Sequence, residues 1–438
     1  MTKFNFSIFL FIFFVFISCQ KKQVHNKGEK NEGEIVDIWV VDSLENRVDQ
    51  LLLSDVAQDI EIIPLQFDKN HSFSFTDNMV AGDNDFFLNT RKMVLHYDKK
   101  GKFLNQIGKR GEGPEDISSS NGIGIDDKNH LIYVAHGLGL ENEIKTYNYQ
   151  GEFIKSTRIA ERGAHMYGTV HQETRNYTFY NNQHVLRRLL PTSDNSKDIW
   201  QIQVQDTSGT ILATFYDPVI MNYIDKNHEG KLENAPSNQW FAFSPILNRY
   251  LDNINFMFDS NDTIYQYLET KKALKPRYIL HCGERPTFKD IRTLNKEPEY
   301  FKYTFITDIL ESKDFLYLVA EKDRFAYLLR VDKKTGATHT IRQEGEIIIS
   351  PIMKVRHRKI TVPGFTNDLC GGLPFFPNSQ DNKQWIAAFD APDLLEKIDI
   401  EQLKKSDVLL PEKRDQLVRI LENLNEDDDP VIMIVTLK

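Results

Sequence analysis

The sequence lacks the short motifs by which many enzymes are recognised. No HExxH, CxxC, GxSxG or Walker A pattern occurs in its 438 residues. The stretch Gly108–Gly113 superficially resembles a phosphate-cradling loop, but neither a Lys-Ser/Thr pair nor a helix start follows it. We therefore expect a tight connecting loop there, and the sequence assigns no catalytic residue, metal ligand or cofactor.

Cysteine is scarce as well. Only Cys19, Cys282 and Cys370 occur, and Cys19 ends an N-terminal apolar run. Exported cysteines can form a disulfide, but two widely separated cysteines in a large domain do not make a disulfide framework. The hydrophobic content of 40% and the aromatic content of 11% supply enough core and strand formers for a large folded domain.

The chain has no excess of basic residues over acidic ones. The chain has 54 Lys and Arg against 63 Asp and Glu, a net charge of −9. A general nucleic-acid binder would have a basic footprint, so we expect no nucleic-acid partner. The local exception is the basic run from Lys354 to Lys359, which we interpret as a solvated strand or loop face.

The segment from Met93 to Pro114 contains the pattern that organises the rest of the chain. Apolar and polar residues alternate on either side of Asp98–Gly101, which predicts a β-hairpin. Gly101 supplies the positive φ of a tight turn, and the Asp98 side chain can bond the backbone ahead of it. The hairpin then runs into Gly108–Pro114, which is too rich in glycine and proline to continue a strand.

Degenerate copies of this strand-turn-strand pattern recur roughly 50 to 65 residues apart. They lie at Glu143–Ile159, Ile199–Tyr216, Asp262–Leu280, Tyr327–Ile341 and Gln384–Ile400. The last copy keeps only its first strand cleanly. Six copies at this spacing predict an all-β fold, a six-bladed β-propeller in which each blade buries its faces against its neighbours.

Both ends of the domain are strand formers. Ile35–Leu65 contains two alternating stretches, and Pro430–Lys438 is strongly β-forming. We expect closure of the ring by N- and C-terminal strands, with Ile35–Leu65 supplying the outermost strand of the closing blade and a first inner strand. Pro411–Leu424 has apolar residues at helical spacing, which predicts a minor C-terminal helix on the propeller rim.

The N-terminus indicates export. An apolar run from Phe4 to Ile17 is too short for a comfortable transmembrane helix and matches a signal-peptide core. Its end, FISC, resembles a bacterial lipobox, with Phe16 in place of the usual Leu. Cys19 is then the predicted lipid-attachment residue; the alternative is a plain secretory signal in which Cys19 has no role. Both interpretations export the protein.

The predicted organisation is a lipoprotein signal peptide over residues 1–19, a flexible tether over residues 20–34 and a propeller domain over residues 35–438. We expect a lipid anchor in the outer membrane of the cell envelope. The acidic cluster that directs some similar lipoproteins to the cell surface does not follow Cys19. A periplasm-facing position is therefore preferred over surface exposure.

Several of these segments together resemble a known family. They are Gly101–Leu104 with Ile107-Gly108 and Gly111–Pro114, Asn261–Tyr265, Asn367–Leu369 with Gly371–Gly372, and Pro430–Lys438. The sequence is similar to the six-bladed, NHL-like β-propeller lipoproteins of Bacteroidota, which are mostly of unassigned function. The resemblance covers nearly the whole mature chain and implies a fold and a compartment more firmly than an activity. Cys370 stands where similar proteins often have an acidic residue, which weakens any ligand role for that corner.

Two hypotheses for function remain. The first is a membrane-tethered binding or scaffold module for a glycan, a peptide or an envelope protein, because six blades present many loops on one rigid ring. The candidate contacts are loop residues: Arg110, Tyr167, Tyr180, Asn181, Asn182 and Trp240. The alternative is a propeller hydrolase or lyase with a metal or a His/Arg/Glu site in the central channel. Asp126-Asp127 and Asp259–Asp262 could supply oxygen ligands to calcium, although Asp and Asn in hairpin turns need no metal.

Overall fold

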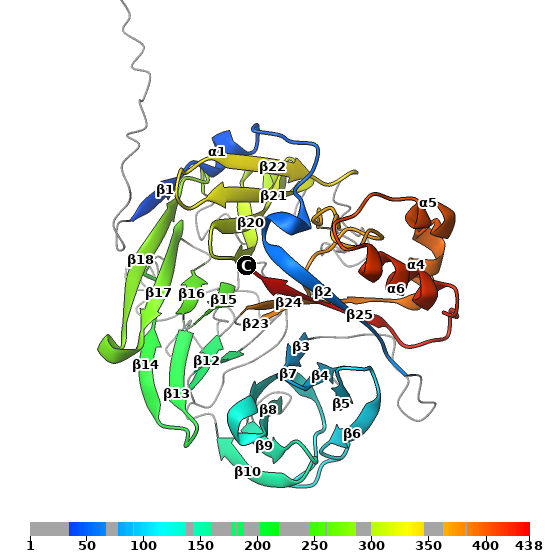
Figure 1. Ribbon diagram of the computed structural model, residues 1–438. Coiled ribbons are helices and arrows are strands. Elements are labelled where there is room, and N and C mark those ends of the chain that lie inside the picture. The colour runs from blue at the N-terminus through cyan, green and yellow to red at the C-terminus, as the bar shows by residue number, and fades with distance from the viewer. Residues whose placement is uncertain are drawn as a thin grey trace, which may run out of the picture.

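A computed structural model of the chain describes residues 35–66, 78–90, 92–136, 143–158, 177–180, 183–187, 202–218, 246–251, 253–258, 261–285, 299–345, 362–381 and 383–438. These residues form six small sheets set around a common axis, so the chain is a six-bladed β-propeller (Figure 1). The predicted all-β fold class is confirmed. Within these residues, no helix is both long and apolar enough to cross a membrane.

Each blade is a sheet with one strand at the axis and successive strands further out. Contacts between neighbouring inner strands place β3, β7, β11, β15, β19 and β23 around the axis. Blades 1 to 3 comprise β3 (Asn78–Ala81), β4 (Asp85–Asn89), β5 (Val94–Asp98) and β6 (Phe103–Ile107); β7 (Ser120–Asp126), β8 (Leu131–His136), β9 (Glu143–Asn148) and β10 (Phe153–Arg158); and β11 (Tyr177–Tyr180), β12 (Gln183–Arg187), β13 (Ile202–Asp206) and β14 (Ile211–Phe215).

The other three blades follow in chain order, except that blade 6 takes its outer strand from the N-terminal region. They comprise β15 (Ile246–Tyr250), β16 (Asn253–Met257), β17 (Thr263–Leu268) and β18 (Ala273–Leu280); β19 (Phe305–Glu311), β20 (Phe315–Lys322), β21 (Phe325–Asp332) and β22 (Thr338–Arg342); and β23 (Ser379–Asp381), β24 (Gln384–Phe389), β25 (Val431–Leu437) and β2 (Ala57–Pro64).

The outer hairpins form as their turn residues predict. The turn glycines have left-handed φ between 74° and 92°, at Gly101, Gly151, Gly209 and Gly336. Oδ1 of Asp98 accepts the backbone N–H groups of Lys100 and Lys102 at 2.8 and 2.9 Å. In blade 4 the turn has no glycine, and Lys272 itself adopts a φ of 48°. The predicted hairpins of blades 1 to 5 are therefore confirmed, including the one that lost its glycine.

Blade 6 closes the ring. Its strand β25, red in Figure 1, lies between β24 and β2 and pairs antiparallel with both. Val431–Val435 are at most 1% exposed, so this strand is interior on both faces. The predicted closure by strands from both ends is confirmed. The expectation that Ile35–Leu65 also supplies an inner strand is wrong, because its first stretch pairs with another blade.

That first stretch is β1 (Val36–Ile38), which lies parallel to β18 as a fifth strand of blade 4. The chain continues through α1 (Val40–Ser43) to the outer edge of blade 5, where Thr340 N donates to Asn46 O at 2.9 Å and Val48 N donates to Thr340 O at 3.0 Å. The N-terminal segment thus covers the outer edges of blades 4 and 5 before it joins blade 6 as β2. Pairing of exposed strand edges by the chain's own segment removes unsatisfied backbone groups there.

Hydrophobic clusters fill the seams, meaning the packed faces of neighbouring blades. Separate clusters span blades 1 and 2, 3 and 4, 4 and 5, 5 and 6, and 6 and 1. Alternation along each strand directs one set of side chains to each neighbour, which is why the blade faces that meet in these five seams are apolar.

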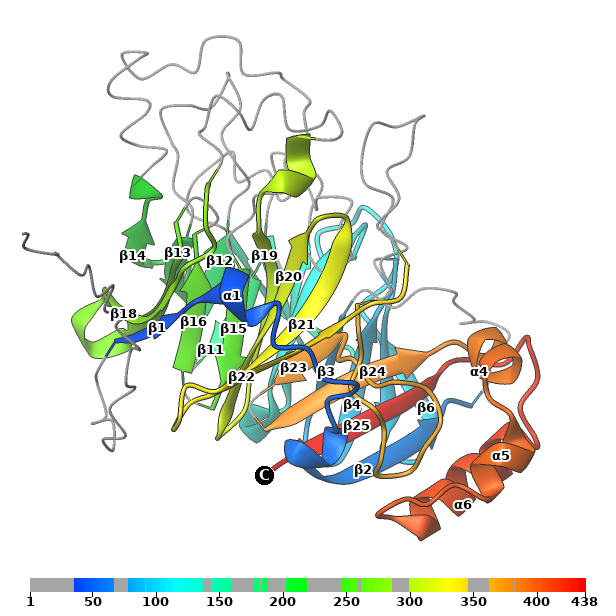
Figure 2. The same cartoon turned by 90° about the horizontal axis from the view of Figure 1, so that it is seen from above.

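Three helices pack against the outer side of blade 6 (Figures 1 and 2). They are α4 (Ala391–Lys397), α5 (Ile400–Lys404) and α6 (Pro411–Leu421). Leu417 and Leu421 are buried in one cluster with Ile62 of β2, and Nε2 of Gln416 donates to Ile62 O at 2.9 Å. The predicted helix on the rim is confirmed. In the last hairpin copy, α4 follows β24 in the chain, and β25 pairs with β24 where a second hairpin strand would lie.

The two cysteines of the domain are buried and free, and they lie in different clusters. Burial raises the pKa of Cys282 to about 12 and that of Cys370 to about 11. Thiols with such pKa values are poor nucleophiles at neutral pH. Both residues therefore act as small core side chains.

Candidate functional site

The inner strands surround a small cavity on the axis of the ring. Its volume is about 50 Å³, and its polar lining comes from Asn78, Thr178, Arg249, Ser379 and Gln380. A space of this size holds a few water molecules and is far below the roughly 300 Å³ at which small-molecule sites begin.

Phe179 closes the cavity on the side of blades 2 and 3. A β-carbon at Gly124 would lie 1.7 Å from Cδ2 of Phe179, so the ring lies directly against the Gly124 backbone. Phe179 also stacks on Tyr133, with ring centroids 4.8 Å apart, and meets His184 edge-on at 4.7 Å. The close approach of the ring explains why position 124 has no side chain.

Hydrogen bonds join the inner strands around the axis. Asn248 Nδ2 donates to Gln380 Oε1 at 2.7 Å, and Gln380 Nε2 donates to Ile309 O at 2.8 Å, which links blades 4, 5 and 6. Arg249 Nη1 donates to Phe179 O at 3.4 Å, which links blade 4 to blade 3. The described inner strands of blades 3 to 6 are therefore joined by hydrogen bonds around the axis.

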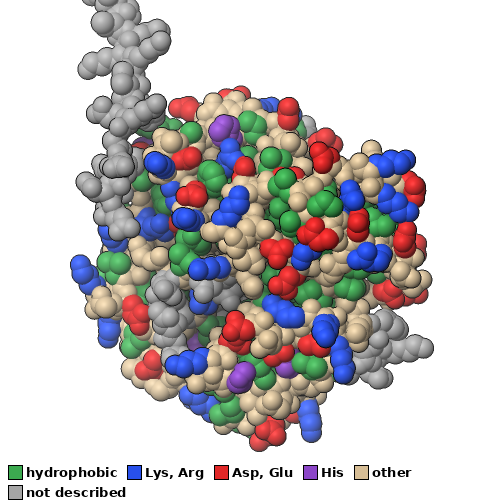
Figure 3. Space-filling model, viewed as in Figure 1, with side chains coloured by type: hydrophobic (Ala, Val, Ile, Leu, Met, Phe, Trp, Pro, Cys, Tyr) green, Lys and Arg blue, Asp and Glu red, His purple; other side chains and the backbone are tan. Residues whose placement is uncertain are grey.

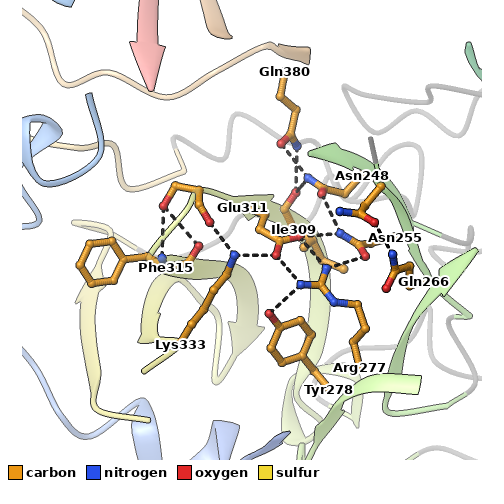
Figure 4. Close-up of polar contacts among 12 residues, drawn as sticks. Asn248, Asn255, Gln266, Arg277, Tyr278, Ile309, Glu311, Phe315, Lys333 and Gln380 are labelled. Atoms are coloured by element: carbon orange, nitrogen blue, oxygen red, sulfur yellow. Dashed lines mark hydrogen bonds and ion pairs between the residues drawn. The ribbon is translucent and has the colours of Figure 1, made fainter. Parts of the chain in front are cut away.

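A charged cluster lies in the seam between blades 4 and 5 (Figure 4). The Glu311 side chain at the end of β19 is fully buried. Arg277 of β18 donates to both its oxygens, at 2.8 and 3.0 Å, and Lys333 Nζ lies 2.6 Å from Oε1. Asn255 Nδ2 adds a fourth donor at 2.5 Å. Lys333 also lies over the ring of Tyr250 at 4.9 Å.

This environment fixes the ionisation of the cluster. Burial alone would raise the pKa of Glu311, but Lys333 and Arg277 outweigh it and hold that pKa below its ordinary value. Burial lowers the pKa of Lys333, and Glu311 opposes that shift. A carboxylate held by four donors is a poor proton acceptor, so this Glu/Arg pair lacks what the hydrolase or lyase hypothesis requires. Among the described residues, no group of three or more His, Cys, Asp or Glu side chains is placed to hold a metal ion.

The loop between β6 and β7 is a compact connection between blades 1 and 2, as predicted. Ile117 N donates to Lys109 O at 2.7 Å, and Gly113 N donates to Asp116 Oδ2 at 3.0 Å. A β-carbon at Gly111 would lie 2.3 Å from the same Asp116 oxygen. A side chain at Gly111 would therefore have to displace the Asp116 carboxyl group that folds over it.

Two side chains of β9 hold the loop against blade 2. Tyr147 donates its hydroxyl to Glu115 O at 2.8 Å, and the buried Lys145 donates to Asp116 O. Arg110 lies on this loop with its side chain exposed. The structure therefore presents the Arg110 guanidinium from a loop whose backbone is fixed by bonds within it and beneath it.

The side chains of the other predicted site residues are not described by the structure. Cys19, Tyr167, Asn181, Asn182 and Trp240 lie outside the described residues, as do Asp259 and the basic run over residues 354–359. Tyr180 ends β11, and only its backbone is described.

The acidic side chains predicted as alternative calcium ligands bond to other groups of the protein. Asp126 accepts a backbone N–H of its own turn at 3.2 Å, and Asp127 accepts the Tyr149 hydroxyl at 2.8 Å. Asp262 pairs with Arg285. These contacts confirm the turn interpretation for Asp126-Asp127.

Sequence reasoning missed the Glu311 cluster. Glu311 and Arg277 are 34 positions apart and come from different blades, and each alone is an ordinary charged residue in a strand pattern. No short motif links them. Figure 3 shows that acidic and basic side chains are interspersed on one face of the ring. The overall charge composition therefore does not indicate which charged residues form ion pairs.

Comparison with solved structures finds proteins of low sequence identity. A protein from Bacteroides fragilis, described as exported, has a TM-score of 0.57 at 15% identity, with 92% of this chain and 100% of that chain covered. A member of the DUF4221 family from Bacteroides vulgatus has a TM-score of 0.42 at 12% identity, with 68% and 88% covered. The first likeness supports the fold alone.

No curated protein matches the sequence significantly. The model of a domain of unknown function, DUF4934, matches residues 35–436, which is nearly all of the described propeller. The chain belongs to the DUF4934 family.

Proposed function

We propose that the protein is an exported, lipid-anchored propeller that binds a glycan, a peptide or an envelope protein through the loops between its blades. The observation that carries this proposal is the contrast between the axis and the Arg110 loop. The axial cavity of about 50 Å³ is too small for such ligands, whereas the loop presents an exposed cation on a fixed backbone.

A fixed loop suits recognition because little conformational entropy is lost when a ligand binds to it. The guanidinium of Arg110 offers a planar array of donors that matches a carboxylate or a phosphate, and its neighbour Lys109 adds a second exposed cation. The chemistry of the loop therefore favours a partner with acidic groups, such as an acidic oligosaccharide or an acidic peptide.

The proposed anchor agrees with the route of the chain. β1 begins at Val36, immediately after the proposed tether, at the outer edge of blade 4. A tether of 15 residues, 20–34, has a root-mean-square length of about 20 Å, enough to hold the ring away from a membrane surface. Cys19→Ala should release the protein from the membrane fraction of cells that express it; retention of the variant would remove the lipid anchor from the proposal.

A thermal-shift screen of soluble residues 20–438 tests the binding function. The probes are acidic and neutral oligosaccharides, acidic and basic peptides, and divalent metals with a chelator control. A ligand at about 100 times its dissociation constant stabilises by about 2.7 kcal/mol, which is measurable for a domain of this size. Stabilisation by an oligosaccharide or a peptide supports the proposal. A melting temperature that responds only to metals and the chelator contradicts it and favours the channel enzyme.

A further inference from the structure

The seam between blades 2 and 3 differs from the five apolar seams, because the described side chains that meet across it are largely polar. Cross-strand register aligns three residues in each blade: Gly124, Tyr133 and Thr146 in blade 2, and Phe179, His184 and Gln205 in blade 3. Residues aligned in this way lie on the same face of their sheet. Each row begins at the axis and runs outward.

The two rows face one another. Gly124 meets Phe179 at the axis, and the rings of Tyr133 and His184 follow with centroids 5.2 Å apart. Further out, Lys155 Nζ of β10 donates to Thr207 O, the residue after β13, at 2.9 Å. Thr146 and Gln205 occupy the next places in the rows, and both side chains are buried.

Five side-chain atoms of blade 3 in this seam have no hydrogen-bond partner in the protein. Gln203 and Gln205 are 0% exposed, and neither the oxygen nor the nitrogen of either amide is hydrogen-bonded. Nδ1 of His184, whose residue is 1% exposed, is unbonded as well. Gln203 lies on the same face as Gln205 because side chains alternate along a strand.

Such a concentration of unmet polar atoms is costly in a protein interior. Burial lowers the pKa of His184 to about 4, an effect that Lys155 reinforces and Asp206 opposes. The ring is therefore neutral at pH 7 and has one donor and one acceptor nitrogen. The unmet groups are thus uncharged and include both donors and acceptors.

We propose that the seam between blades 2 and 3 binds ordered water molecules, which bond to Gln203, Gln205 and His184 and join the two blades. Water is the ligand that fits, because it both donates and accepts, is neutral and needs little space. An ion would require opposing charge, and the amides and the neutral imidazole supply none.

Replacing the two glutamines by a residue of the same shape but without polar atoms distinguishes a seam that contains water from one that does not. Methionine has nearly the shape of glutamine without its polar atoms. If water bonds the amides, Gln203→Met and Gln205→Met each lower the melting temperature of residues 20–438 by about 2–4 °C, because the bound water loses partners. If the amides are unbonded, the same changes raise the melting temperature. Gln402→Met, on the exposed surface of α5, is the matched control and should leave it unchanged.

A crystal structure of residues 20–438 decides the question independently, even if a variant fails to fold. Water molecules within hydrogen-bond distance of both glutamine amides and of His184 Nδ1 support the proposal. Direct protein partners for these atoms, or a seam without water, overturn it. An unchanged or raised melting temperature in both methionine variants overturns it as well.

Discussion

The ring of Phe179 occupies the space into which a side chain at Gly124 would project, with Cδ2 only 1.7 Å from the position of a β-carbon. This contact joins blade 3 to blade 2 beside the axial cavity. Because Phe179 also stacks on Tyr133 at 4.8 Å, the ring cannot withdraw without breaking that stack. Packing at the axis thus depends on the lack of a β-carbon at position 124.

Gly124→Ala should therefore destabilise the protein by about 1–3 kcal/mol, the usual cost of overpacking a core. Urea unfolding of the variant measures this loss. The control is the double-mutant cycle with Phe179→Ala, in which the second change removes the clash. An equal cost of Gly124→Ala with and without the Phe179 ring would mean that the contact is not the cause.

Glu311→Gln should lower stability by about 3–5 kcal/mol, because it leaves Arg277 and Lys333 in the seam without their counter-charge. The exposed Glu344→Gln is the matched control and should change stability by less than about 0.5 kcal/mol. Chemical denaturation at pH 7 measures both. A small effect at Glu311, comparable with the control, would show that the cluster is not a clamp between blades.

The same cluster predicts a dependence on acid. The pKa of Glu311 lies below its ordinary value in the folded state, so its stabilising contribution is complete above the unfolded pKa of about 4.3 and is lost as the pH falls through the folded value. The difference in stability between the wild type and Glu311→Gln should be constant from pH 7 to about 4.5 and shrink below that. If the stability difference between the two proteins grew on acidification, the pKa of Glu311 would be raised in the folded state and not lowered.

His184 predicts a second pH effect in a different range. Its pKa falls from 6.5 to about 4 because of burial, with Lys155 acting in the same direction and Asp206 against it. The unfolded state therefore takes up a proton first, and stability should decline by up to about 3 kcal/mol between pH 6.5 and pH 4. Subtracting the profile of His184→Gln isolates this term from the other histidines. Identical slopes in the two proteins would refute the assignment.

Deletion of Val431–Lys438 should prevent stable folding. The deletion removes β25, which pairs with β24 on one side and β2 on the other, and it exposes both of their edges. Aggregation or the loss of a cooperative thermal transition, followed by light scattering and circular dichroism, is the expected result. A truncated protein with an unchanged melting temperature would contradict ring closure by β25.

Local chemistry made much of the fold predictable. The turn at Asp98–Gly101 forms its hairpin from a glycine and an aspartate that act on their own neighbours. Repetition of that pattern then indicates the number of blades, because five copies each form an outer hairpin and the sixth supplies β24 of blade 6. The apolar spacing of Pro411–Leu424 likewise predicted α6, since a helix satisfies its backbone internally.

The remaining features of the fold and of the site could not be predicted, because they depend on contacts between residues far apart in the sequence. β1 has an alternating pattern like β2, but its place beside β18 depends on an open sheet edge more than 200 residues away in the chain. The bonds of Glu311 and the facing rows at Tyr133 and His184 depend on which blade faces become neighbours. Sequence alone also treats Gln203 and Gln205 as ordinary polar positions of a strand, although the ring buries both completely.

The ring is proposed to recognise its partner through its loops and not through its axis. The most direct measurement is the affinity of residues 20–438 for the ligand found in the screen, for the wild type, Arg110→Ala and Lys102→Ala. Lys102 is an exposed cation at the opposite end of β6 and serves as the control. Arg110→Ala should abolish binding with a nearly unchanged melting temperature, whereas Lys102→Ala should bind as the wild type does. An unaltered affinity in Arg110→Ala would contradict the proposed recognition by this loop.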